Sequence, residues 1–126
     1  MKQISTTNAP AAIGPYSQAL RSGNMVFVSG QIPVDPQTGV MAEGIEAQAH
    51  RALTNLKNVL AAAGLETANV IKTVVFLADL ADFPKVNAIY EQYFSAPYPA
   101  RSCVQVAGIP KGALLEIECI AIDEKA

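Results

Sequence analysis

Apolar residues recur along this chain with a helical period in two segments. From 45 to 63 they fall at three- and four-residue steps, which is the spacing of an amphipathic helix. A second stripe predicts another helix that starts at Phe83-Pro84, with Asp82 as its cap. That stripe consists of Val86, Ile89, Tyr90, Tyr93 and Phe94. Gly64 is placed to end the first helix in a left-handed conformation, with Leu65 folding back on its last turn.

Shorter apolar runs predict strands at 16–21, 25–29, 70–77, about 100–107 and 114–122. Ser22-Gly23-Asn24 separates the first two runs and favours a tight hairpin. The strand 70–77 is apolar on both faces in its second half, which is typical of a strand covered on both sides. The order of a hairpin, helix, strand, helix and two strands predicts a single α+β domain over 1–126. Both helices should pack on one face of a mixed sheet.

Alternation within the last two strands predicts which side chains share a face. In 114–122 an apolar set of Leu115, Ile117, Cys119 and Ala121 opposes Glu116, Glu118, Ile120 and Ile122; in 100–107, Val104 and Val106 oppose Arg101, Cys103 and Gln105. We expect the purely apolar sets to face the helices. The opposite face would then carry Arg101 and Glu116 together. Because it mixes charges with isoleucines, we expect partner subunits to cover it and to leave a pocket that water can reach.

The composition supports burial against other subunits and argues against nucleic acid. Hydrophobic residues make up 51% of the chain and charged ones 16%, which leaves few charges to coat a lone domain. The net charge is −2 and no Lys or Arg cluster is present, whereas phosphate backbones need one. The N-terminus resembles no export or organelle signal, and no apolar run is long enough to span a bilayer. We therefore expect a cytoplasmic protein with no membrane partner.

The candidate chemistry is narrow because the chain has one histidine, His50, and two cysteines, Cys103 and Cys119, without CxxC spacing. An ordinary zinc site needs more such ligands, and no GxGxxG or Walker-type loop is present. His50 lies at a polar helix position, where a solvated or capping role is expected. We expect both thiols to be reduced and Cys119 to be a small core residue. Any catalysis must use arginine, carboxylates, tyrosine, amides, thiols or water.

The segment from Tyr98 to Ala113, YPARSCVQVAGIPKGA, together with Glu116-Ile117-Glu118, closely resembles the signature of the RidA (YjgF) family. The resemblance extends to three upstream motifs and so to essentially the whole chain. These motifs are IGPYSQA at 13–19, FVSGQIP at 27–33 and VNAIY at 86–90.

This resemblance implies a homotrimer of chorismate-mutase-like subunits with clefts at the subunit boundaries. The implied activity is hydrolysis of 2-iminobutanoate and 2-iminopropanoate, which leave pyridoxal-phosphate dehydratases, to 2-oxo acids and ammonia, without a cofactor. By position, Arg101 matches the carboxylate-binding arginine and Glu116 the residue that handles water. Cys103 matches a thiol position lining the pocket. The remaining pocket wall is matched by Tyr16, Ser29, Gly30 and Asn87.

Each of these roles has a simpler alternative. Without the motif, the favoured interpretation is a structural ion pair of Arg101 with Glu116 or Glu118. With the motif, the favoured role of Arg101 is substrate binding. Tyr16 could only pack at its loop, and Cys103 is expected to be structural because no histidine base accompanies it. Two other functions stay open, an endoribonuclease and a non-enzymatic small-ligand or chaperone-like binding module.

Overall fold

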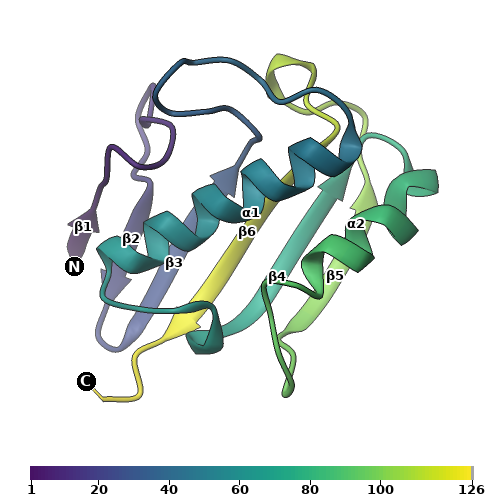
Figure 1. Cartoon of the computed structure of the whole chain (residues 1–126). Helices are drawn as coiled ribbons and strands as arrows, with labels where there is room; N and C mark the ends of the chain where they lie inside the picture. Colours follow the sequence, from purple (N-terminus) through teal and green to yellow (C-terminus); the bar gives the residue numbers. More distant parts are fainter. Residues whose placement is uncertain (126) are drawn as a thin grey trace.

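A computed structural model describes residues 1–125 of the chain. One mixed sheet holds the strands in the order β1-β2-β3-β6-β4-β5 (Figure 1). The strands are β1 (Lys2–Ile4), β2 (Ala19–Ser22), β3 (Met25–Gln31), β4 (Val70–Leu77), β5 (Ala100–Gln105) and β6 (Leu115–Ile122). Every neighbouring pair is antiparallel except β4 and β5, which are parallel.

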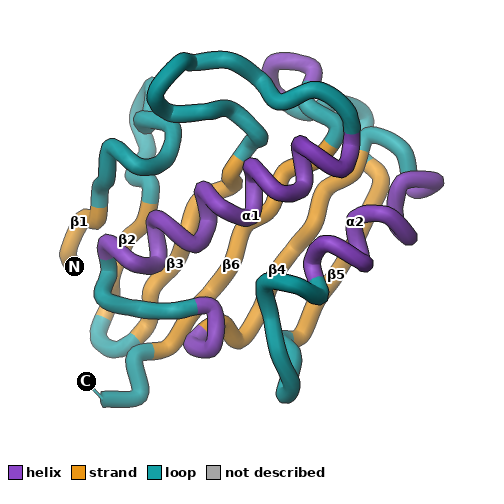
Figure 2. Tube along the Cα trace, viewed as in Figure 1, coloured by secondary structure: helices purple, strands orange, loops and turns teal. Residues whose placement is uncertain are grey.

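The two helices, α1 (Ile45–Ala62) and α2 (Phe83–Tyr90), lie side by side on one face of this sheet (Figure 2). The predicted α+β architecture, with a mixed sheet and both helices on one face, is confirmed. The sequence patterns missed the short strand β1 and three 3₁₀ turns, at Thr67–Asn69, Leu80–Asp82 and Pro110–Gly112. In this part of the chain, no helix has the length and apolar character needed to cross a membrane.

The core lies between the helices and the sheet. The inward-facing residues of β6 are all buried, namely Leu115, Ile117, Cys119 and Ala121, as predicted for this strand. They pack with buried leucines of α1 such as Leu53, Leu56 and Leu60. Burial raises the pKa of the Cys119 thiol to about 12, with the charge of Glu118 adding to the effect. Cys119 is therefore a neutral core residue, as expected.

The end of α1 follows the sequence prediction closely. Gly64 adopts φ +76°, and the N–H of the buried Leu65 donates to the carbonyl of Leu60 at 2.9 Å. This is the hydrogen bond by which a left-handed glycine closes a helix.

The start and end of α2 differ from the prediction. The Asp82 side chain makes no capping hydrogen bond, because a 3₁₀ turn precedes the helix and Asp82 already has φ −81° and ψ −5°. Asp79 caps that turn instead, accepting from the N–H of Ala81 at 2.9 Å. The helix ends at Tyr90, so Tyr93 and Phe94 lie in the turns that follow. Phe94 is still buried, while the exposed His50 bonds through Nδ1 to the Tyr93 hydroxyl at 2.8 Å.

The predicted faces of β5 are wrong. β5 pairs in parallel with β4 so that Arg101 lies beside Thr73 and Cys103 beside Val75. Thr73 and Val75 are buried under the helices, and residues paired in register point to the same side of a sheet. Arg101 and Cys103 therefore face the helices, and Val104, 42% exposed, faces away. An edge strand tolerates this reversal because the helix layer covers it only in part.

The sheet face without helices, which we call the open face, carries Phe27, Ser29, Glu116, Glu118 and Ile120 from β3 and β6. Val74 and Phe76 of β4 lie on it half-buried, so the chain covers only one side of this strand. Within residues 1–125, the two-sided cover expected for β4 is therefore only partial.

The left-handed Gly64 provides a test of this packing. Gly64→Ala should lower the free energy of unfolding by about 1–2 kcal/mol, because an L side chain is strained at φ +76°. A Cβ at Gly64 would meet no atom within 4 Å, so the loss should be purely conformational.

Gly108→Ala is the matched control, because a Cβ there also has open space and its backbone φ lies outside the left-handed range. This variant should unfold at the wild-type denaturant concentration or slightly above it. Equal midpoints for the two variants in urea would contradict the role given to Gly64.

Candidate functional site

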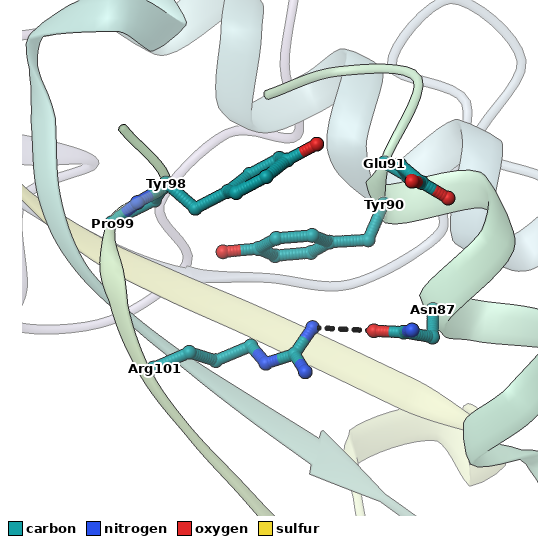
Figure 3. Close-up of a pocket in the computed structure, with 6 residues that line it drawn as sticks. All are labelled: Asn87, Tyr90, Glu91, Tyr98, Pro99 and Arg101. Atoms are coloured by element: carbon teal, nitrogen blue, oxygen red, sulfur yellow. Dashed lines mark hydrogen bonds between the residues drawn. The ribbon is translucent and has the colours of Figure 1, made fainter. Parts of the chain in front are cut away.

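A polar pocket beside α2 is built around Arg101 at the sheet edge. Its volume is about 360 Å³, and Figure 3 shows the residues around it. They are Asn87, Tyr90, Glu91, Tyr98, Pro99 and Arg101. The pocket is therefore formed by α2, by the segment that follows it and by the start of β5.

Arg101 is held in this pocket by neutral groups. Its Nη1 donates to Oδ1 of Asn87 at 2.9 Å, the bond drawn in Figure 3. The guanidinium carbon lies 4.8 Å from the ring centre of Tyr90 and 5.2 Å from that of Phe83. Both distances fall within the range of cation–π attraction.

Among residues 1–125 Arg101 has no carboxylate at ion-pair distance. The one ion pair found there joins Arg21 to Asp123 at 3.3 Å. A structural ion pair of Arg101 with Glu116 or Glu118 is ruled out within the chain, because both glutamates lie on the open face. Arg101 thus keeps most of its five N–H donors for another acceptor.

Glu116 occupies a second position, on the open face of β6. Its carboxylate packs against Gly30, in the stretch between Val28 and Gln31 where the β3–β6 register shifts. A Cβ added to Gly30 would overlap Oε2 of Glu116 and lie 2.8 Å from its Cδ. The adjacent Ser29 hydroxyl donates to the Ser17 carbonyl at 2.6 Å. Glycine at position 30 therefore makes room for the carboxylate.

The pKa of Glu116 is raised above its usual value of 4.5, first by burial and then by the charge of Glu118. Glu118 stands two residues along the same strand and so on the same face. A carboxyl group with a raised pKa gives up and takes back a proton more readily near neutral pH.

Tyr16 and Cys103 lie at different depths. Tyr16 is 53% exposed and lines a second hollow of about 470 Å³, together with Gly30 and Lys111. Cys103 is half-buried against the core beside Arg101. Burial raises the pKa of its thiol, and the nearby Arg101 charge opposes this only in part. The thiol is therefore protonated at neutral pH, which is unsuited to a nucleophile.

The predicted site residues consequently form two groups in one chain. Arg101, Asn87 and Cys103 lie on the helix side of the sheet, with Asn87 and Arg101 in direct contact. Glu116, Gly30 and Ser29 lie on the open face, and Tyr16 lies over the hollow beside them. The expectation that Arg101 and Glu116 share one face is wrong, for the reason given above for β5.

Sequence reasoning missed the aromatic residues around Arg101. The sequence pattern indicates for Phe83 and Tyr90 only the start and the apolar stripe of a helix. The available signal was the spacing of Phe83, Asn87 and Tyr90, which places all three on one helical face. Between residues 1 and 125, no three His, Cys, Asp or Glu side chains gather in a way that could hold a metal ion.

Residues 6–123 match the protein family described as Endoribonuclease L-PSP. The chain belongs to this family. A curated member, the 2-iminobutanoate/2-iminopropanoate deaminase of Salmonella typhimurium, is 55% identical over 96% of this chain and 97% of its own.

Solved structures of the family superpose closely on this fold. TdcF of Escherichia coli, crystallised with bound serine, is 50% identical with a TM-score of 0.95, covering 98% of this chain and 100% of that one. RidA of an Antarctic Psychrobacter species is 46% identical with a TM-score of 0.95 over the same shares. The RidA resemblance drawn from the motifs is thus confirmed.

The neighbouring charges on β6 of this family member give a pH prediction. Glu118→Gln should lower the pKa of Glu116, because it removes the like charge that disfavours the Glu116 carboxylate. A folded-state pKa above the unfolded value means that Glu116 stabilises the fold at acidic pH and loses this contribution as pH rises through the raised pKa. Glu118→Gln should make that loss smaller.

Carbon-detected NMR titration of the Glu116 carboxyl would measure the shift directly. Glu46→Gln is the control, because Glu46 lies on α1 at the other side of the sheet. An unchanged Glu116 pKa in Glu118→Gln would show that burial alone raises it.

Proposed function

We propose that this protein is a 2-iminobutanoate/2-iminopropanoate deaminase, which hydrolyses small 2-imino acids to 2-oxo acids and ammonia. The curated relative of that name, 55% identical over nearly the whole chain, supports this reaction. The observation that carries the proposal is Arg101, a guanidinium that is held in place but lacks a carboxylate partner within residues 1–125.

In the proposed complex, Arg101 grips the substrate carboxylate. A guanidinium fork matches a planar carboxylate with two parallel charge-assisted bonds. Asn87 occupies one Nη1 hydrogen, which leaves Nη2 and Nε for such a pair. The relative TdcF was crystallised with bound serine, which supports a ligand of similar size for this chain. The substrate class we propose is accordingly a small 2-imino acid.

Glu116 is the proposed acid-base group. It would hold a water molecule against the imine carbon and accept its proton as the carbon–oxygen bond forms. Returning that proton to the nitrogen completes a carbinolamine, C(OH)NH2. The same carboxylate would then pass the carbinolamine hydroxyl proton to the amine, so that the carbon–nitrogen bond breaks, ammonia leaves and the 2-oxo acid remains. The raised pKa of Glu116 suits this two-way transfer. Ser29, Gly30 and Tyr16 would complete this side of the pocket.

Arg101 and Glu116 face opposite sides of the sheet, so one chain cannot bring both to one substrate. The half-apolar open face of β3, β6 and β4 also needs cover. Both features support a homotrimer in which Arg101, Asn87 and Cys103 of one subunit meet Glu116, Gly30 and Tyr16 of the next.

Two other functions can be distinguished from the proposed deaminase by experiment. The family description names an endoribonuclease, but a net charge of −2 and a single histidine suit RNA cleavage poorly. A non-enzymatic binding module would use the same arginine without turnover. Ammonia release from a freshly generated imine separates the deaminase from both.

The activity is tested by adding the protein to a threonine dehydratase reaction that contains semicarbazide as an imine trap. The trapped fraction should fall and 2-oxobutanoate should form faster. An unchanged trapped fraction at a large excess of protein would refute the proposal for this substrate.

Substitutions should separate the roles of the side chains. Arg101→Ala should lose about 2–5 kcal/mol of transition-state binding, roughly 30-fold or more in kcat/KM, and Arg101→Lys should recover only part of it. Glu116→Gln should depress kcat more than it raises KM. Cys103→Ser is the control that keeps most activity. A dead Cys103→Ser beside an active Arg101→Ala would indicate covalent catalysis instead.

Mixed assemblies test the shared site. Light scattering should give about three times the 13.3 kDa chain mass. Equal amounts of the Arg101→Ala and Glu116→Gln proteins would be unfolded together and refolded. About one quarter of the sites should then be active, because that fraction combines an intact arginine with an intact glutamate from the next subunit. A monomer, or mixtures no more active than the separate variants, would refute the shared site.

A further inference from the structure

Three side chains of α2 contact the guanidinium of Arg101. Phe83, Asn87 and Tyr90 are spaced four and three residues apart, so they lie on one helical face. Asn87 supplies a hydrogen bond, and the two rings supply their faces. Of the two rings, Tyr90 is the closer to the guanidinium carbon, at 4.8 Å against 5.2 Å.

Burial, a hydrogen bond and a stacking contact together hold the Tyr90 side chain in place. It is 5% exposed, and its hydroxyl shares a 2.8 Å hydrogen bond with Oγ1 of the fully buried Thr73. Phe94 stacks on the ring with a centroid distance of 4.4 Å. Burial raises the pKa of the Tyr90 hydroxyl, so this hydroxyl keeps its proton at neutral pH.

The sheet register connects this anchor to the arginine. Thr73 of β4 is the direct partner of Arg101 on the parallel strand β5. Tyr90 is therefore bonded to β4 through its hydroxyl and contacts the Arg101 side chain through its ring. Figure 3 shows the guanidinium beside that ring. Thr73, Tyr90 and Arg101 form a closed chain of contacts across β4, α2 and β5.

This arrangement answers a physical problem at the sheet edge. A long arginine side chain on an exposed edge strand has many rotamers, and fixing them on ligand binding costs entropy. An ion pair would fix them but would occupy the donors that a carboxylate needs. An aromatic face fixes the guanidinium without using any N–H donor.

We propose that Tyr90 is a positioning residue, whose ring, tied to Thr73, holds the Arg101 guanidinium in the orientation that grips the substrate carboxylate. This inference rests on the proposed function. The competing role for Tyr90 is simple core packing, which would affect folding but not the arginine.

Steady-state kinetics on the intact protein separate the two roles. Tyr90→Leu removes the aromatic face and should raise KM for the imino acid about five- to tenfold while kcat changes by less than about threefold. Tyr90→Phe keeps the aromatic face but loses the hydrogen bond to Thr73, so KM should rise by less than about threefold. Tyr93→Leu is the matched control. The Tyr93 hydroxyl is hydrogen-bonded to Nδ1 of His50, so this variant should leave KM within about twofold.

The same substitution in an Arg101→Ala background tests whether Tyr90 acts through the arginine. There Tyr90→Leu should change kcat/KM by less than about twofold, since the group it positions is gone. An equal loss in both backgrounds, or a loss in kcat alone, would assign Tyr90 to core packing and overturn the proposal.

An NMR measurement keeps this test independent of the deaminase assay. The Nε–H signal of Arg101, assigned by its absence from Arg101→Ala, should be displaced by the ring current of Tyr90. It should move toward the free-arginine position in Tyr90→Leu, but stay displaced in Tyr90→Phe and Tyr93→Leu. A signal unmoved by Tyr90→Leu would overturn the proposal. If the signal moves as expected while the wild-type protein lacks deaminase activity, the proposed function alone fails.

Discussion

The parallel pairing of β4 with β5 is the constraint on which the arrangement of this protein depends. Parallel neighbours cannot be joined by a tight turn, so the chain must cross over the sheet between them. That crossover contains α2 and returns the chain to the sheet edge at Ala100. The same pairing sets Arg101 beside Thr73, on the side that α2 covers. The arginine and the helix that holds it are thus brought together by one topological requirement.

The two faces of the sheet solve different physical problems. The helix face is filled by leucines of α1 and by the alternate residues of β6, and a polar pocket lies at the edge of this core. The open face combines apolar residues with two glutamates and is only half-buried in the chain. Gly30 belongs to this second face, where its missing side chain gives the Glu116 carboxylate its place. Our proposal that subunits share the site follows from this division, because Arg101 and Glu116 lie on opposite faces.

The environment of Arg101 shows how a protein can fix a charged side chain without satisfying its charge. Aromatic faces and an amide oxygen restrict the guanidinium, yet they neutralise nothing. At Glu116, by contrast, the surroundings oppose the charge, because burial and the neighbouring Glu118 both disfavour the ionised carboxylate. The two groups are thereby prepared for different tasks, the first for holding an anion and the second for moving a proton.

The sequence by itself determined both helices, five of the six strands and much of their packing. The periodicity of 45–63, the glycine at 64 and the alternation of 114–122 depend on local spacing and backbone conformation, and all three reappear in the structure. The motif around Arg101 likewise placed the chain in its family. Asp82 shows the limit of local reasoning, because a 3₁₀ turn before α2 moved the cap to Asp79.

Only the tertiary structure decided on which side of the sheet Arg101 lies and what surrounds it. Alternation along β5 gives the same two sets of residues for either orientation, and the choice depends on the register with β4, which is a contact distant in sequence. The Tyr90 ring was visible in the sequence as one more apolar helical position. The role proposed for Tyr90 depends on its contacts with Thr73 and Arg101. These two residues lie on neighbouring strands, and no local sequence pattern places them beside Tyr90.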